Sequence, residues 1–159
     1  MKRFLFLILI VSFNISASDE GIQQWVYNTL ERAQANLDKG NIEAAEKIYY
    51  DYANDTWSSR SYDHFVFLRT YAYFLLSFDR NEEALRYLKQ ASLKRDMPPY
   101  DIFELHFTLG QVYYVTGDRE NAKKTLLKWV EIGEKNKLDL KPEGYAILAT
   151  IYALSLIHI

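Results

Sequence analysis

The 159-residue sequence contains no cysteine, which excludes disulfide bonds, thiol chemistry and cysteine metal sites. It also lacks an excess of basic charge, because 19 Lys and Arg residues stand against 21 Asp and Glu residues, a net charge of −2. A chain that binds nucleic acid needs positive charge against the phosphates, so nucleic acid is not expected as a partner. Gly-rich phosphate loops, serine-nucleophile motifs and Asp-rich calcium loops are absent too. We therefore expect no enzyme activity, no cofactor, no metal and no small-molecule substrate.

The sequence has no apolar run of the length that spans a membrane, about 20 residues. At its start, Lys2 and Arg3 precede a short apolar run at residues 4–11, and small residues follow around Ala17. This order is typical of a cleavable signal peptide, with an uncleaved membrane anchor as the alternative. We expect a signal peptide at 1–17, a leader at 18–25, and export to the periplasm, which suits a chain without disulfides.

What the sequence does contain is a repeat. The segments GNIEAAEKIYYDYA (40–53), DRNEEALRYLKQAS (79–92) and GDRENAKKTLLKWV (117–130) share one order: a turn residue, an alanine five positions on, and a large apolar residue four positions later. The alanines Ala45, Ala84 and Ala122 are 39 residues (45 to 84) and 38 residues (84 to 122) apart. Another helical stripe with a small residue precedes each turn, at Ala33, Ala72 and Gly110. A period of this size with two helices per unit predicts a helical solenoid.

The turns and helix starts have their own signals. Gly40 and Gly117 suit the left-handed backbone needed between two helices, and Asp79 is a tolerated substitute at the equivalent position. Asp79 and Asp101 each precede a glutamate by three positions, which is the spacing of a capping box. Pro142 suits the first turn of a helix.

These residues resemble the tetratricopeptide repeat (TPR). The pattern matches best at 103–136, where Leu109, Gly110, Tyr113, Gly117, Ala122 and Leu126 fall in the family's positions. We expect Tyr113, Ala122 and Leu126 to be buried between the helices of that repeat. The resemblance implies an all-α fold, a right-handed helical solenoid of antiparallel helix pairs with about three and a half repeats. Their expected bounds are 26–59, 65–98, 103–136 and, for the first helix of a fourth repeat, 142–153.

A narrower resemblance is carried by MPPYDIFELHFTLGQVYYVTGDRENAKKTLLKWVEIGE and the following KPEGYAILATIYA. This text is similar to the small periplasmic TPR proteins encoded beside TonB, ExbB and ExbD genes. The resemblance implies an accessory role in energising the uptake of iron complexes across the outer membrane. It also implies a protein or peptide partner, such as the periplasmic region of TonB or ExbD, and membrane contact only through a partner. The alternative is the N-terminal TPR region of a larger exported protein of polysaccharide export or cell-wall machinery.

The last six residues, LSLIHI (154–159), equal the translation of the end sequence of a common transposon-based sequencing adapter. We expect them to be foreign to the natural protein, which would then continue with other residues after position 153. The alternative is an ordinary apolar end to the helix.

The first helices of TPR solenoids line the concave face, and this resemblance gives the candidate binding residues. The family's clamp for a peptide carboxylate needs Lys and Asn where this chain has Arg69 and Tyr73, so that clamp is not reproduced. We expect the groove to hold an extended or helical protein segment, with Tyr73 and Tyr114 as anchors. The alternative is that these aromatic residues only pack neighbouring repeats. The predicted groove residues are Arg69, Thr70, Tyr73, Leu76, Glu104, Phe107, Thr108, Gln111 and Tyr114.

Overall fold

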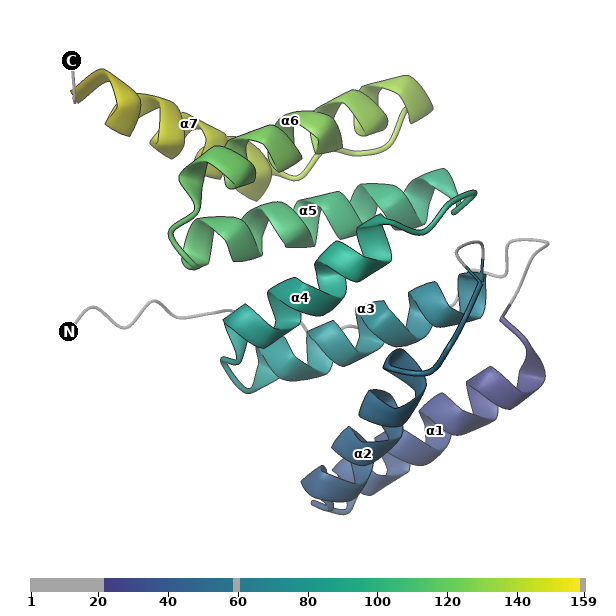
Figure 1. Ribbon diagram of the computed structural model, residues 1–159. Helices are drawn as coiled ribbons and strands as arrows, with labels where there is room; N and C mark the ends of the chain where they lie inside the picture. Colours follow the sequence, from purple (N-terminus) through teal and green to yellow (C-terminus); the bar gives the residue numbers. More distant parts are fainter. Residues whose placement is uncertain (1–21, 59–60, 158–159) are drawn as a thin grey trace.

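The computed structural model describes residues 22–58 and 61–157, and every regular element in these ranges is a helix (Figure 1). The predicted signal peptide, the leader up to residue 21, and His158 and Ile159 lie outside the described residues. The helices are α1 (Gln24–Asp38), α2 (Ile42–Ala53), α3 (Tyr62–Ser77), α4 (Asn81–Ser92), α5 (Pro99–Val115), α6 (Arg119–Asn136) and α7 (Pro142–Ile157).

The helices form three pairs and one further helix, stacked in chain order from α1 and α2 at the bottom of Figure 1 to α7 at the top. The pairs are α1 with α2, α3 with α4, and α5 with α6; α2 then packs on α3, α4 on α5, and α7 on both α5 and α6. Each unit thus contacts mainly its neighbours, which is the arrangement of a solenoid. The chain is an all-α helical solenoid of helix pairs.

The turns within the pairs follow the sequence expectation, whereas the capping boxes do not. Gly40 and Gly117 have φ angles of 77° and 87°, and Asp79 takes the same region with a φ of 57°. Because Asp79 occupies the left-handed position, Arg80 is the residue that precedes α4. The capping box at Asp101 was also wrong, since α5 begins at Pro99 and Asp101 lies inside its first turn. Pro142 opens α7 as expected.

Small residues allow the helices of each pair to approach closely. Ala33, Ala72, Ala45, Ala84 and Ala122 are all fully buried, as the repeat alignment predicts. At Gly110 the approach is closer still, because a Cβ there would lie 2.6 Å from Cγ of Leu126.

The interior divides into two apolar clusters that meet at α5. The larger cluster joins α1 to α5 and receives Leu105 and Leu109 from one side of α5. The smaller joins α5, α6 and α7 around Trp129, which is fully buried. Tyr113 was predicted to be buried, but it is only half-buried: its ring packs on the larger cluster, and a tyrosine can leave its polar end in water.

The end of the described chain is helical beyond the predicted boundary, because α7 continues from 153 to Ile157. Its first turn packs so closely on α6 that a Cβ at Gly144 would lie 2.4 Å from the ring of Trp129.

Among residues 22–58 and 61–157, no helix has both the length and the apolar character needed to cross a membrane.

Candidate functional site

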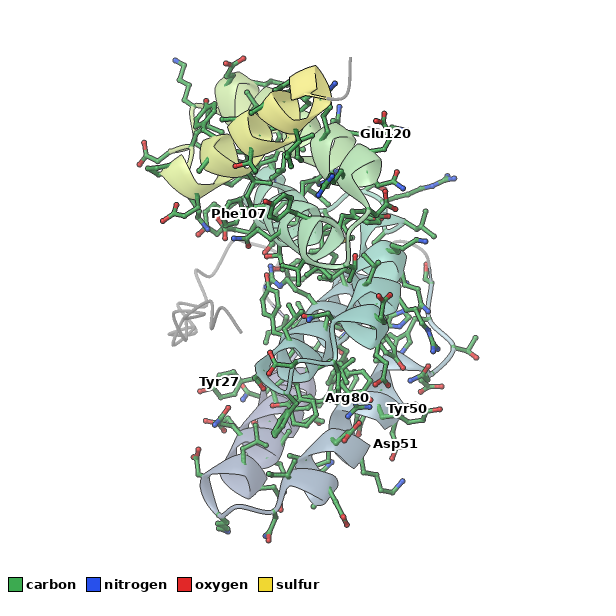
Figure 2. The ribbon with its side chains drawn as sticks, turned by 90° about the vertical axis from the view of Figure 1, so that its left-hand side faces the viewer. Tyr27, Tyr50, Asp51, Arg80, Phe107 and Glu120 are labelled. Atoms are coloured by element: carbon green, nitrogen blue, oxygen red, sulfur yellow. The ribbon has the colours of Figure 1, made fainter. Side chains whose placement is uncertain are left out.

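The predicted groove residues come from α3 and α5, which are both first helices of their pairs. In Figure 2, Tyr27 of α1 and Phe107 of α5 lie on one side of the stack, whereas Tyr50 and Asp51 of α2 lie on the other. We define the first-helix face as the surface formed by Tyr73, Leu76, Gln111 and Tyr114, which are all half-buried.

Arg69 lies beside this face but is engaged within the protein. Its Nη1 donates to Oδ1 of Asp101 at 2.5 Å, and its guanidinium lies over the ring of Phe65, 5.2 Å from the centroid. The hydroxyl of Tyr62 donates to the other carboxylate oxygen of Asp101 at 2.8 Å. Burial, together with this hydrogen bond, raises the pKa of Tyr62 to about 12. The site therefore holds a neutral tyrosine, a carboxylate and a guanidinium that satisfy one another.

Tyr73 and Thr108 are also brought together, with 3.4 Å between Oη and Oγ1, so that a second contact links α3 to α5. Burial raises the pKa of Tyr73, and its hydroxyl stays protonated at neutral pH. Thr70, in contrast, is buried beneath the surface, with 6% of its area exposed. The prediction that Thr70 lines the groove is therefore wrong, because Thr70 lies on the buried side of α3.

Glu104 and Phe107 are covered by the segment that leads into α7. Lys141 Nζ donates to Oε2 of Glu104 at 2.7 Å and lies 4.5 Å from the ring centroid of Phe107. Phe107 also packs on Trp129, 5.2 Å between centroids, and only 4% of its area is exposed. Phe107 is therefore a core residue and not a groove residue, because α6 and Lys141 close over it.

The two charged residues of the predicted groove are each paired with a residue outside that set: Arg69 pairs with Asp101, and Glu104 pairs with Lys141. What remains accessible is aromatic, aliphatic and amide surface at Tyr73, Leu76, Gln111 and Tyr114, a combination that can contact a polypeptide. Sequence reasoning missed Tyr62, Asp101 and Lys141. The sequence suggested Asp101 only as a helix-capping residue. Lys141 is 37 residues from its partner Glu104, and nothing in the neighbouring sequence indicates that the two meet.

Among the described residues, His64 and His106 are both held by contacts within the protein. His64 is buried; its Nε2 lies 2.9 Å from the Ala53 carbonyl oxygen and its Nδ1 2.7 Å from Nζ of Lys94. A carbonyl can only accept and an ammonium can only donate, so one neutral tautomer, protonated on Nε2, satisfies both contacts. His106 bonds through Nδ1 to the carbonyl of Ile102 at 2.8 Å, within its own helix. Across the described ranges, no three His, Asp or Glu side chains gather closely enough to bind a metal ion.

Comparison with solved structures identifies the fold. A kinesin light chain from Podospora anserina with TPR-like repeats superposes with a TM-score of 0.62 at 17% identity, over 80% of this chain and 65% of that one. The Yersinia enterocolitica type III secretion chaperone SycD, in complex with a peptide of the translocator YopD, gives 0.59 at 15% identity, over 84% and 97%. PcrH in complex with the chaperone-binding region of PopD gives 0.51 at 16% identity, over 84% and 91%.

These similarities show a TPR-like fold. The match to the kinesin light chain spans less than two thirds of that chain's length. No family model and no curated protein sequence matches this chain.

Proposed function

We propose that this chain is a non-catalytic scaffold that binds a segment of a partner protein on its first-helix face. The observation that carries the proposal is the row of half-buried side chains Tyr73, Leu76, Gln111 and Tyr114, beside charged groups that are already paired. Two aromatic rings supply contact area and the amide supplies hydrogen bonds to a polypeptide. Two proteins of similar fold support this function: SycD, solved with a peptide of the translocator YopD, and PcrH, solved with the chaperone-binding region of PopD.

The recognised segment is held mainly by contact area and neutral hydrogen bonds. Arg69 is the only cation among the predicted groove residues, and Asp101 already neutralises it at 2.5 Å. A partner carboxylate would have to displace Asp101, and an unpaired carboxylate is costly when it is buried. The partner is therefore expected to present an internal, largely uncharged segment to this face, rather than its C-terminal carboxylate.

At a finer level, the proposed scaffold works in the periplasm as an accessory of the TonB–ExbB–ExbD system. The amino-terminal sequence supports export, and the resemblance of residues 97–134 and 141–153 to the periplasmic TPR proteins supports the partner. Amino-terminal sequencing of the mature protein tests the first point. A chain that begins near Ser18 or Asp19 is expected, and one that still begins at Met1 would contradict cleavage.

The second candidate is the N-terminal TPR region of a larger exported protein of polysaccharide export or cell-wall machinery, which the same amino-terminal sequence and TPR-like fold would fit. Sequencing the genomic DNA past the codon for Leu154 separates the two. A stop codon within a few further repeats favours the scaffold, and a barrel or hydrolase pattern favours the larger protein.

The binding face is tested with the double variant Tyr73→Ala/Tyr114→Ala and the control Tyr50→Ala/Tyr100→Ala. The control removes two tyrosines that are more than half exposed and lie outside the first-helix face. Circular dichroism first establishes that both variants keep their helices. Capture of the periplasmic regions of TonB and ExbD is then measured; we expect the first variant to lose capture and the control to keep it. Undiminished capture by the folded first variant would rule out this face, and no capture by the unmodified chain would rule out the TonB assignment.

A further inference from the structure

The first two connections between helix pairs lie on the same edge of the stack, and a lysine side chain ties them together. Residues 54–58 lead from α2 toward α3, and residues 93–98 lead from α4 to α5 (Figure 1). Lys94, in the second connection, donates from Nζ to the backbone carbonyl oxygen of Ser58 in the first, at 3.0 Å. The same Nζ lies 2.7 Å from Nδ1 of His64, in the first turn of α3. One ammonium group therefore joins the end of α4 to the connection before α3 and to the start of α3.

The ring of His64 is held so that Nδ1 accepts this contact. Its Nε2 lies 2.9 Å from the carbonyl oxygen of Ala53 at the end of α2, and the ring stacks on Trp57, 5.5 Å between centroids at an interplanar angle of 22°. Only 8% of the residue's area is exposed. Because the carbonyl fixes the proton on Nε2, the lone pair of Nδ1 is directed at Lys94.

Protonation of Nδ1 would turn this attraction into repulsion. The imidazolium would direct an N–H at an ammonium 2.7 Å away, and two donors of like charge cannot stay at that distance. Asp55, in the connection before α3, favours the charged ring. Asp63, which precedes His64 on α3, accepts from the backbone N–H of Gln23 at 3.2 Å. Lys94 forms no ion pair with any described residue, so no carboxylate offsets the repulsion.

The change of charge falls in the acidic range. Burial lowers the pKa of His64 from its ordinary value of 6.5, the hydrogen bond to the Ala53 carbonyl opposes this effect, and the Lys94 cation lowers the pKa further. A lowered pKa means that the folded chain keeps a neutral ring at pH 7 and takes up the proton only below pH 6.5.

The repeat does not require a titratable residue at this position. By the spacing of the repeat, the equivalents of His64 are Trp25, 39 positions before (25 to 64), and Ile102, 38 positions after (64 to 102). Both of these residues are apolar, so an apolar side chain meets the packing needs of a first helix here. What the imidazole adds is a charge that changes with pH.

We propose that His64 and Lys94 form a pH-sensitive latch between the two connections. At neutral pH the imidazole accepts the hydrogen bond of Lys94, and the latch is closed. When Nδ1 takes up a proton, the ammonium leaves, its bond to Ser58 is lost, and residues 93–98 are released from the start of α3. These residues join the second pair to the third, so acidification loosens the junction of those pairs. The proposal does not depend on what the first-helix face binds.

Nuclear magnetic resonance on the full chain follows the state of the latch. The ring nitrogen shifts of His64 report its protonation. Hydrogen exchange of the Lys94 amide, which donates to the Ala91 carbonyl at 3.1 Å, reports whether the end of α4 is held. The Thr116 amide, bonded to the Val112 carbonyl at the end of α5, is the reference, because the ratio of the two rates cancels the intrinsic effect of pH on exchange. We expect this ratio to rise about tenfold as His64 is protonated, the effect of losing one hydrogen bond from a charged donor.

Three variants assign the response to the two residues. Lys94→Met removes the ammonium and keeps a long side chain; it should raise the pKa of His64 and leave the exchange ratio high at every pH. Lys89→Met, at an exposed position of α4, is the matched control and should leave the pKa of His64 unchanged. His64→Gln cannot take up a proton and should make the ratio independent of pH. Circular dichroism establishes first that each variant keeps its helices.

Three results would overturn the proposal. The first is an exchange ratio that stays constant while His64 takes up its proton, or a ring that stays neutral until the chain unfolds, because the latch then does not open. The second is an unchanged pKa of His64 in folded Lys94→Met, because the ammonium then does not act on the ring. The third is a ratio that still depends on pH in folded His64→Gln, which would assign the response to another group.

Discussion

Enlarging the side chain at Gly110 and shortening the one at Leu126 tests how closely the two helices of the third pair are packed. Alanine at position 110 has two opposing effects. It favours the helix by about 1 kcal/mol relative to glycine, but its Cβ would lie 2.6 Å from Cγ and 2.7 Å from Cδ2 of the fully buried Leu126. Overpacking of this kind costs about 1–3 kcal/mol. We therefore expect Gly110→Ala to lower the free energy of unfolding by up to about 2 kcal/mol despite its better helix propensity.

When Leu126→Ala is already present, Gly110→Ala should instead raise the free energy of unfolding. That substitution alone costs about 2–5 kcal/mol, because it leaves a cavity. The clash is then absent, so adding Gly110→Ala returns the helix propensity and fills part of the cavity, a gain of about 1 kcal/mol or more. Urea unfolding followed by far-ultraviolet circular dichroism measures all four proteins.

The refuting result is additivity within about 0.5 kcal/mol, which would mean that the two residues do not touch. Gly117→Ala is the matched control. Its Cβ would meet no atom within 4 Å, and its φ of 87° makes alanine strained whatever occupies position 126. Its cost should therefore be the same in the unmodified chain and in the Leu126→Ala background.

Two further predictions concern buried polar groups. Asp101→Ala should cost about 3 kcal/mol in urea unfolding because it leaves the guanidinium of Arg69 without its partner, and Arg69→Met/Asp101→Leu should restore most of the loss; equal stability of Asp101→Ala and the unmodified chain would contradict the ion pair. Burial, with a smaller contribution from the Lys94 cation, lowers the pKa of His64 in the folded chain. Below pH 6.5 the unfolded chain therefore binds more protons than the folded one. The free energy of unfolding should fall as the pH drops from about 6.5 toward the folded pKa, by at most about 1.4 kcal/mol per pH unit from this group. The hydrogen bond to the Ala53 carbonyl and, to a smaller extent, Asp55 oppose this lowering of the His64 pKa. Burial also lowers the pKa of His106, which adds a dependence of the same sign, so His64→Gln should flatten the slope without abolishing it. An unchanged slope would contradict a neutral buried His64.

The fold could be predicted from the sequence because its determinants are local and repeated. An alanine such as Ala84, five positions after a turn and four before a large apolar residue, specifies both a helix and its buried side. The left-handed turns at Gly40 and Gly117 follow from the same alignment. Each of these signals lies within one helix pair, where sequence spacing and spatial distance correspond closely.

The candidate site was predicted less well, because it forms between pairs. Which residues of α3 meet α5 depends on how residues 93–98 orient the third pair on the second. Asp101 pairs with Arg69 across 32 residues and Lys141 with Glu104 across 37, and no spacing rule connects such positions. Phe107 illustrates the consequence: its helical position suggests the groove, but Trp129 and Lys141 cover it.

Within the described part of the chain, three ion pairs join successive units of the stack, and they bear on binding more than on stability. Arg80 of the second pair bonds Glu46 of the first at 2.6 Å, Arg69 bonds Asp101 in the third, and Lys141 before α7 bonds Glu104. Such pairs add little net stability when their desolvation is counted, but their geometry is specific. In a solenoid each unit is oriented only by its neighbours, so a shift at the Arg69–Asp101 junction changes the distance between Tyr73 on α3 and Tyr114 on α5. The first-helix face is therefore shaped by residues that need not touch the partner. The variant Arg69→Met/Asp101→Leu separates the two roles, since it keeps apolar packing at the junction while removing the directional contact.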